Sequence, residues 1–418
     1  MVVTAGREAA PQDSQGTAVT TIQHHTDAPE PPAEPTSQPE AVHPYSWRRA
    51  LLWSAVAYVL SRGAVLAGAG AVSAAELPRP PSGLGRILEV LNAWDGNWYY
   101  EVVRRGYPRR VPPDVTFFDL EARAAFFPLY PRLVWALDKV LPANEVFAAL
   151  MLNLVLGAIF VLLVGLMARR LFGTKVAGRA MVLTALFPGS FVLSFAYSEA
   201  LMLVLVAGCL LLLMERRWLF AGILAGLATA SRPNAIAVVA ACAVAAAVAI
   251  MERREWKSLL APLLAPVGWI SFQLFLAHQT GEQGAWFRVQ REAWEEGTSF
   301  GLRAVKDIGN AVVHPWNSPK NILTLLCVAA MLFGLWAMWK RRLPLPVTVY
   351  TLGILALMLI PQTVTARPRF LFTAFPLLIS IAAVWPEDDD ELWPLLTAAC
   401  GTGLVAVTVL YGVFGAIP

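Results

Sequence analysis

Residues 147–168 have the sequence FAALMLNLVLGAIFVLLVGLMA, an apolar run without a charged side chain. A helix of about 20 such residues matches the hydrocarbon thickness of a bilayer. Arg169 and Arg170 follow the run directly, and paired basic residues of this kind are typical of the cytoplasmic end of a membrane span. The stretch therefore predicts a transmembrane helix.

The rest of the chain repeats this pattern. Of its 418 residues 57% are hydrophobic and 15% are charged, with a mean hydropathy of +0.56, and a soluble domain cannot bury that much apolar surface. We predict an all-α polytopic membrane protein of about eleven helices, although several segments are short, above all 218–231, so one pair could be re-entrant. The segments are 50–72, 147–168, 177–195, 198–214, 218–231, 233–251, 258–277, 321–339, 345–361, 370–386 and 392–414.

The basic residues set the orientation. With a cytoplasmic N-terminus, the inner connections carry fourteen Lys and Arg residues and the short outer turns carry three. The inner residues are Arg48, Arg49, Arg169, Arg170, Lys175, Arg179, Arg216, Arg217, Arg253, Arg254, Lys257, Lys340, Arg341 and Arg342. The outer three are Arg232, Arg367 and Arg369. We expect a multi-pass plasma-membrane protein.

Segments outside the spans differ in character. Residues 1–46 are rich in Pro, Ala and Glu without an apolar period, which predicts a disordered cytoplasmic tail ahead of an integral membrane domain at 47–418. Two outer connections, 73–146 and 278–320, are too long to be turns and are the expected place of function. The four cysteines lie in apolar runs, and no His or Cys spacing indicates a metal site, so we predict no metal ligand, and a divalent metal is left open.

The first outer loop contains a carboxylate among aromatic residues, in the sequence NAWDGNWYYE at 92–101. Apolar residues recur at three- and four-residue spacing from Leu88 to Val102, which predicts an amphipathic helix in the membrane interface with Asp95 beside the lipid surface. The alternative is that Asp95 only caps a helix. The sequence AAFFPLYP at 124–131 indicates a second surface element.

The three outer arginines lie in short turns that would meet this loop on one face. Guanidinium groups at that depth are costly without an anion, and phosphate suits their planar fork. The alternative is structural: the arginines pair with Glu199 or with helix carbonyls and hold the bundle together. Together with Asp95, the turns favour a site for a phosphate-bearing lipid.

Four motifs in order, WDGNWYYEVVRRGYP from Trp94, AAFFPLYP from Ala124, FPGSFVLSFAYSEALMLVL from Phe187 and ATASRPNAI from Ala228, resemble the PIG-V family of mannosyltransferases in the GT-C superfamily. The resemblance implies a GT-C-like bundle that transfers mannose from a polyprenyl-phosphate-linked donor to a glycolipid, glycan or protein acceptor on the extracytoplasmic side. By similarity, Asp95 matches the catalytic acidic residue. The Arg excess over Lys and the acidic tail indicate a bacterial member rather than one acting on glycosylphosphatidylinositol.

The residues suit this chemistry. A polyprenyl phosphate leaves as a stable anion, so one base and a set of cations suffice: Asp95 would accept the proton of the acceptor hydroxyl during inversion, and Arg232, Arg367 and Arg369 would bind the phosphate. Substrate contacts are predicted for further polar and aromatic residues. They are Trp94, Asn97, Trp98, Tyr99, Tyr130, Tyr197, Glu199 and Asn234.

Three alternatives remain open. A transporter or flippase of lipid-linked sugars would place charges near the bilayer midplane and interrupt helices there. A GT-C enzyme could use another sugar, and a non-catalytic subunit could rely on a partner protein. The expected partners are the lipid-linked donor, the acceptor and membrane lipid, with no nucleic acid and no cofactor indicated.

Overall fold

The computed structural model describes residues 45–75, 85–141, 144–362, 368–386, 389 and 391–414. Across these ranges the backbone forms helices and no strand, and one isolated bridge joins Thr298 and Pro361. The predicted all-α class is confirmed. Most of the predicted tail, residues 1–44, lies outside the described residues.

Six helical stretches are long and apolar enough to cross a membrane within the described part of the chain. They are α1 (Trp47–Ala74), α5 (Glu145–Phe172), η3 with α9 (Pro233–Ile236, Ala237–Arg253), η4 with α10 and α11 (Trp256–Leu259, Leu260–Leu264, Val267–Thr280), α14 (Pro319–Arg341) and α18 (Leu392–Gly412).

Shorter apolar helices complete the bundle. They are α6 (Thr174–Leu186), η2 (Pro188–Leu193), α7 (Glu199–Met214), α8 (Trp218–Thr229), α15 (Leu345–Leu359), α16 (Pro368–Thr373) and α17 (Pro376–Val384). Each of the eleven predicted segments therefore contains helix. Segments 177–195, 258–277 and 370–386 are each divided into shorter helices, and 233–251 begins as the 3₁₀ helix η3. The breaks in 177–195 and 370–386 give the chain irregular backbone next to the site described below.

Arg62 of α1 stabilises the first of these interruptions. Its guanidinium group is 7% exposed and donates hydrogen bonds to the Ser190 carbonyl (3.0 Å), the Ser190 hydroxyl (3.0 Å) and the Ser194 hydroxyl (2.7 Å). A further bond reaches the Ala185 carbonyl at 3.4 Å, near the end of α6. Carbonyls at the end of a helix lack partners within the helix, so this side chain satisfies groups that the break leaves free.

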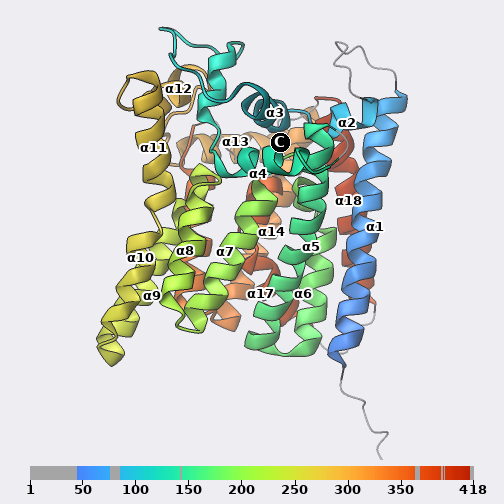
Figure 1. The fold of residues 1–418 in the computed structure, drawn as a ribbon. Helices are drawn as coiled ribbons and strands as arrows, with labels where there is room; N and C mark the ends of the chain where they lie inside the picture. The colour runs from blue at the N-terminus through green and yellow to red at the C-terminus, as the bar shows by residue number, and fades with distance from the viewer. Residues whose placement is uncertain are drawn as a thin grey trace, which may run out of the picture. The chain divides into compact units, whose positions relative to one another are not determined.

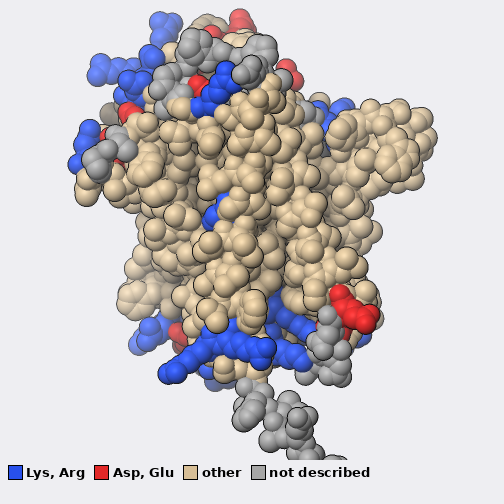
Figure 2. All heavy atoms as spheres, turned by 90° about the vertical axis from the view of Figure 1, so that its right-hand side faces the viewer, with Lys and Arg blue, Asp and Glu red and all other residues tan. Residues whose placement is uncertain are grey.

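Charged side chains gather at the two ends of the helical bundle. On the face drawn in Figure 2, Lys and Arg form a dense band at one end, Asp and Glu appear with them at both ends, and the surface between is almost free of charge. A broad uncharged band is what lipid requires of a membrane-spanning surface. The chain is a multi-pass membrane protein.

Short helices from both long connections gather at one end of the bundle (Figure 1). The first connection forms α2 (Arg86–Leu91), α3 (Asp95–Arg105), η1 (Leu120–Ala125) and α4 (Leu129–Asp138), and the second forms α12 (Ala285–Glu292), α13 (Leu302–Val313) and η5 (Pro315–Asn317). The second surface element predicted at 124–131 corresponds to the end of η1 and the start of α4.

One local prediction is wrong. The periodic pattern from Leu88 to Val102 does not form one amphipathic helix, because the backbone breaks between α2 and α3. Trp94 is the N-cap of α3 at φ 63°, and Asp95 is the first residue of that helix. Periodicity of apolar side chains does not detect a backbone turn of this kind, since the buried residues on both sides keep the helical spacing.

Candidate functional site

Four charged side chains from four separate elements form a closed ring, called here the charge ring: Asp95, Arg369, Glu199 and Arg232. Asp95 Oδ2 lies 2.8 Å from Arg369 Nη2 and 3.5 Å from Arg232 Nη2. Glu199 Oε2 lies 2.8 Å from Arg232 Nη1, and its Oε1 lies 3.3 Å from Arg369 Nε. Each arginine thus contacts both carboxylates, and the formal charges cancel.

The ring is almost removed from water. The exposed fraction of the side chain is 1% for Glu199, 6% for Arg369 and 8% for Arg232, against 17% for Asp95. Charges at such depth interact more strongly than in water and are costly when unpaired. Asp95 is the member that solvent or a ligand reaches most easily.

Local structure places each member. Asp95 begins α3, Glu199 begins α7, Arg369 is the second residue of α16, and Arg232 lies in the turn between α8 and η3. Asn153, in the middle of α5, donates hydrogen bonds to the carbonyls of Phe195 (2.6 Å) and Tyr197 (2.8 Å), which fixes the turn before Glu199.

The protonation of Asp95 reflects its neighbours. Burial raises the pKa of this carboxyl, but the positive charges of Arg369 and Arg232 and their hydrogen bonds outweigh burial, so the pKa lies below its ordinary value. Opposite charges within 4–6 Å favour the charged form. Asp95 is therefore a carboxylate at neutral pH, able to accept a proton. Burial also raises the pKa of Tyr99, which stays a neutral phenol.

Several polar atoms beside the ring have no hydrogen-bond partner. They include Arg369 Nη1, Asn234 Oδ1 and the Tyr197 hydroxyl, all buried. The Arg369 guanidinium also lies over the rings of Tyr197 (5.2 Å) and Phe370 (4.8 Å). A buried donor without a partner is costly, so Arg369 Nη1 marks a position where an incoming acceptor group would be favourable.

A cavity of about 790 Å³ opens onto the ring. Asp95, Tyr99, Arg232, Asn234 and Arg369 contribute to its lining, together with residues from both long connections. Its volume falls in the range of small-molecule sites, roughly 300–1,000 Å³. The ring therefore borders a space large enough for a sugar phosphate and part of a second substrate.

Another part of the cavity lining comes from one face of α12 and the residues that follow it. Trp286, Gln290 and Trp294, spaced four residues apart, all line the cavity, and we call them the α12 stripe. The indole nitrogens of Trp286 and Trp294 donate to the carbonyls of Ala125 (3.1 Å) and Ala122 (3.2 Å). These two bonds fix the rings against η1 of the first connection.

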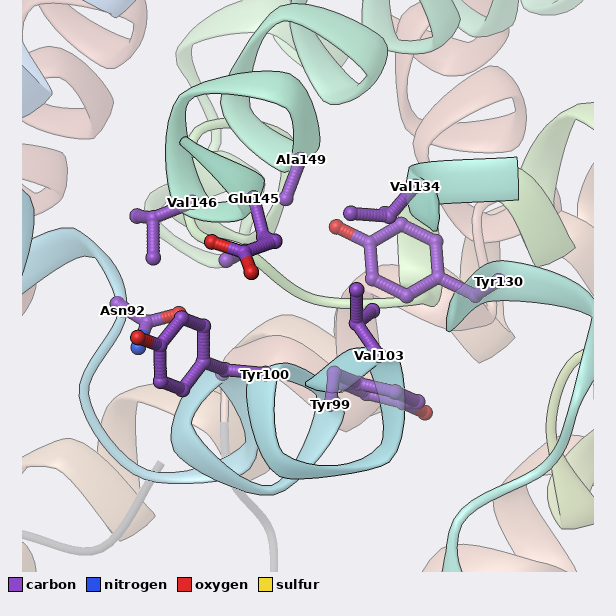
Figure 3. A pocket seen from close by; sticks show the side chains of 11 residues that line it. Asn92, Tyr99, Tyr100, Val103, Tyr130, Val134, Glu145, Val146 and Ala149 are labelled. Atoms are coloured by element: carbon purple, nitrogen blue, oxygen red, sulfur yellow. The ribbon is translucent and has the colours of Figure 1, made fainter. Parts of the chain in front are cut away.

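A second, much smaller cavity lies beside α3. It has a volume of about 10 Å³, roughly the space for one water molecule. Figure 3 shows the Glu145 carboxylate turned toward it from α5, facing Asn92 and Tyr100. Tyr99 lines both cavities, and its hydroxyl lies 2.5 Å from Ser198 Oγ, which also accepts a bond from Arg232 Nη1 at 3.2 Å.

Four other predicted site residues are absent from the lining of the large cavity, although Tyr130 lines the small one. Trp94 contacts the end of α18, and Asn97 accepts a hydrogen bond from Asn92 at 2.9 Å. Tyr130 accepts one from Asn153 at 3.1 Å, and Trp98 packs on Phe126. Arg367 lies outside the described residues.

Of the two structural alternatives for the charged residues, the pairing of an arginine with Glu199 is observed and the capping of a helix by Asp95 is not. Arg232 pairs with Glu199, as the structural alternative expected, and it also approaches Asp95. Asp95 does not cap α3 with its side chain, because the N-cap residue is Trp94 and no side-chain cap bond forms. The convergence predicted for the first loop and two of the arginine turns is present.

Some contributing residues were not singled out from the sequence. Arg62 and Asn153 are polar residues inside apolar helices, and that placement was the available signal, because a polar group in a membrane span needs an internal partner. Gln290 and Arg291 line the cavity from α12, where nothing in the local sequence marks them.

No group of three or more His, Cys, Asp or Glu side chains that could hold a metal ion occurs among the described residues. The carboxylates of the charge ring contact guanidinium groups.

One family model matches part of the chain. Residues 127–278 match the family model of dolichyl-phosphate-mannose-protein mannosyltransferases. No curated protein matches the sequence.

Solved structures match over most of the chain. ArnT from Cupriavidus metallidurans bound to undecaprenyl phosphate is similar with a TM-score of 0.50 at 13% identity, over 89% of this chain and 76% of that one. The oligosaccharyltransferase of Archaeoglobus fulgidus in the apo form gives a TM-score of 0.45 at 15% identity, over 88% of this chain and 56% of that one. The predicted GT-C-like bundle is confirmed, while the PIG-V subfamily stays a prediction.

Proposed function

We propose that this chain, a membrane glycosyltransferase of the GT-C type, transfers mannose from a polyprenyl-phosphate-linked donor to a glycolipid or glycan acceptor. The observation that carries the proposal is the charge ring on the wall of a cavity of about 790 Å³. The matched family supports mannose as the sugar, because the description of that family names a dolichyl-phosphate-mannose donor.

The arginines of the ring supply the donor phosphate site. Arg369 Nη1 is buried without a hydrogen-bond partner, and Arg369 and Arg232 both line the cavity. Guanidinium groups bind phosphate oxygens in a forked geometry, and such charge-assisted bonds are about twice as strong as neutral ones. The phosphate of the donor carries one negative charge, and because the ring itself is neutral, the phosphate would share the two arginines with Asp95 and Glu199.

Asp95 is the general base. The acceptor hydroxyl attacks the anomeric carbon, its oxygen forms the new glycosidic bond, and its proton passes to the Asp95 carboxylate. The bond between the anomeric carbon and the phosphate oxygen breaks, and the electron pair leaves with the phosphate. The product is a polyprenyl phosphate with one more negative charge, and the configuration of the sugar is inverted.

Arg369 couples the two halves of this step. It contacts Asp95 Oδ2 at 2.8 Å on one side, and its Nη1 is available to a phosphate on the other. As Asp95 takes up a proton and loses its charge, the phosphate gains a charge. The guanidinium group keeps an anionic partner throughout, so the charge that develops is stabilised by a preorganised cation.

The acceptor binds along the α12 stripe. Two fixed indole rings with a side-chain amide between them offer apolar faces and hydrogen-bond groups at the spacing of one helical turn. A sugar ring has the same combination of apolar faces and hydroxyl groups. The mixed character of this wall favours a carbohydrate acceptor over a prenyl chain.

The orientation predicted from the sequence completes the proposal. The basic end of the bundle faces the cytoplasm of a bacterial cell, by the positive-inside bias, and the end that carries α3 and α12 faces the extracytoplasmic side of the plasma membrane. Residues 73–146 then form the catalytic loop and residues 278–320 the acceptor loop.

The test uses the purified full chain in lipid, polyprenyl-phosphate-[³H]mannose and a membrane extract as the source of acceptors. Wild type is expected to form a labelled glycolipid or glycan. Asp95→Asn is expected to lower this activity about 1,000-fold, as for loss of a general base, while the protein still folds and shows a cooperative melting transition. Asp95→Asn with wild-type activity would exclude Asp95 as the base. Labelled mannolipid that only crosses the bilayer of vesicles, without transfer, would favour a flippase.

A further inference from the structure

The backbone immediately before Asp95 has an unusual conformation. Trp94 has φ 63° and ψ −120°, a region that glycine adopts freely and that residues with a Cβ atom avoid. The surrounding structure must hold such a residue in place. Because Trp94 is the N-cap of α3, its conformation sets the direction in which Asp95 and the helix begin.

The contacts that hold Trp94 come from the other end of the chain. The indole nitrogen donates a hydrogen bond to the Tyr411 carbonyl at 3.1 Å, and the ring packs against Phe414 with 4.9 Å between centroids. Tyr411 lies in the last turn of α18, 317 residues beyond Trp94 in sequence, and Phe414 lies just after that helix. Figure 1 shows the end of α18 beside α2 and α3.

The end of α18 is itself closely packed. A Cβ atom built on Gly412 would lie 2.9 Å from a methyl carbon of Val72 in α1 and 3.1 Å from one of Val90 in α2. Contacts this short leave no room for a side chain at residue 412. The end of α18 therefore has a fixed position against the two helices that precede the Trp94 turn.

Trp94 lines neither of the two cavities described above. Its neighbour Asp95 lines that cavity and contacts Arg369. We infer that Trp94 is a positioning residue: the end of α18 holds its indole, the indole holds the strained backbone, and the backbone directs the Asp95 carboxylate toward the arginine pair. This inference rests on the proposed function for its kinetic consequence.

Two substitutions of Trp94 distinguish a positioning role from direct contact with the substrate. Trp94→Ala and Trp94→Gly both remove the indole, but only glycine keeps φ near 63° without cost. We expect kcat to fall at least tenfold further in Trp94→Ala than in Trp94→Gly, with the donor KM of both within threefold of wild type, because the arginines are unchanged. Trp339→Ala, at a distant position that is 77% exposed, is the control and should keep wild-type kinetics.

A role in stacking on the sugar gives a different result. In that case both variants lose the same interaction, their kcat values agree, and the KM rises in both. Equal kcat values in Trp94→Ala and Trp94→Gly would overturn the inference while leaving the proposed function intact. An inactive wild type would instead count against the proposed function.

Two measurements test the inference without relying on the single comparison. Phe414→Ala should reproduce part of the Trp94→Ala effect, and the double variant should lose no more activity than Trp94→Ala alone, since the two act as one contact. Hydrogen exchange of the amides at 92–98 needs no activity: exchange should be faster in Trp94→Ala and near wild type in Trp94→Gly. Full additivity, or equal exchange in both variants, would contradict the inference.

Discussion

Asp95 is a carboxylate whose properties depend on two arginines from distant parts of the chain. Arg369 and Arg232 lie 2.8 and 3.5 Å from the same oxygen atom, so both cations act on one proton-accepting group. In the free protein these contacts make Asp95 a weak base. Under the proposed mechanism, a bound phosphate that takes over part of the arginine charge would raise the pKa of Asp95 and strengthen it as a base when the acceptor hydroxyl is deprotonated.

This dependence predicts the pH profile. Asp95 must be deprotonated to act as a base, and the pH dependence of kcat/KM reports the pKa values of the free enzyme. The midpoint of the acid limb of kcat/KM should therefore lie below the ordinary Asp pKa of about 3.9. Arg232→Gln removes one of the cations that lower the pKa and should shift this limb to higher pH, measured by transfer assays over a range of buffers. A limb that does not move would contradict the assignment of Asp95.

Glu199 contributes to the stability of the protein through the same charge ring. It is 1% exposed and pairs with both arginines. Glu199→Gln leaves two buried cations with one carboxylate, and loss of a partner from a buried ion pair costs roughly 3 to 5 kcal/mol. We expect a clear loss of thermal stability.

The matched control for this prediction is Glu215→Gln. Glu215 pairs with Arg170 at 2.8 Å, but the side chains are 41% and 44% exposed. Exposed pairs contribute about 1 kcal/mol or less. The measurement is the melting temperature of the two variants in the same lipid. An equal loss of melting temperature in Glu199→Gln and Glu215→Gln would show that burial does not determine how much the charge ring contributes to stability.

At the scale of elements, two interruptions of helices meet beside the ring. The 3₁₀ helix η2 packs on α16, the helix that carries Arg369, and Arg62 fixes η2 from α1. Gly189 of η2 makes this approach possible, because a Cβ atom there would collide with the Pro368 carbonyl and with Phe372. The position of Arg369 thus depends on the absence of a side chain in another element.

Gly189→Ala should therefore move α16 and reduce activity. We expect the donor KM to rise at least tenfold, because Arg369 is displaced from the phosphate site. The measurement is transfer of [³H]mannose as a function of donor concentration. Gly63→Ala is the control, since a Cβ atom there meets nothing within 4 Å. A donor KM unchanged by Gly189→Ala would mean that α16 adapts without cost.

At the scale of the whole molecule, the cavity is closed by two connections that are far apart in sequence. Arg288 of α12 donates to the carbonyls of Pro112 (2.9 Å) and Val111 (3.1 Å) in the first connection. Its remaining N–H groups bind Glu282 and Glu292. With Trp286 and Trp294, this side chain joins α12 to the connection that carries Asp95.

Arg288→Ala should loosen this closure. We expect faster hydrogen exchange in residues 107–125 and a rise of several-fold in the acceptor KM, with the donor KM little changed, because the charge ring is not touched. Arg303→Ala serves as the control, since Arg303 pairs only locally with Asp307 at 3.2 Å among the interactions found for it. Wild-type exchange at 107–125 in Arg288→Ala would show that the two connections hold together without this residue.

The sequence predicted the helical class and the positions of the helical segments, because both follow from local properties, while six of the eleven predicted segments form stretches long enough to span a membrane among the described residues. Apolar runs and basic flanks are written directly in the chain, and all eleven predicted segments contain helix. The aromatic loop around Asp95 and two of the arginine turns were also recognisable, because a charged side chain near the hydrocarbon region is costly unless it has a partner. These residues meet as predicted.

Only the tertiary structure decided how they meet. The order of charges in the ring, the strained turn at Trp94 and the support of that turn by α18 depend on contacts between segments hundreds of residues apart. The same holds for the cavity wall formed by α12. Hydrophobic period and charge are properties of single segments, whereas the direction of a side chain depends on backbone dihedrals and on close packing that no single segment contains.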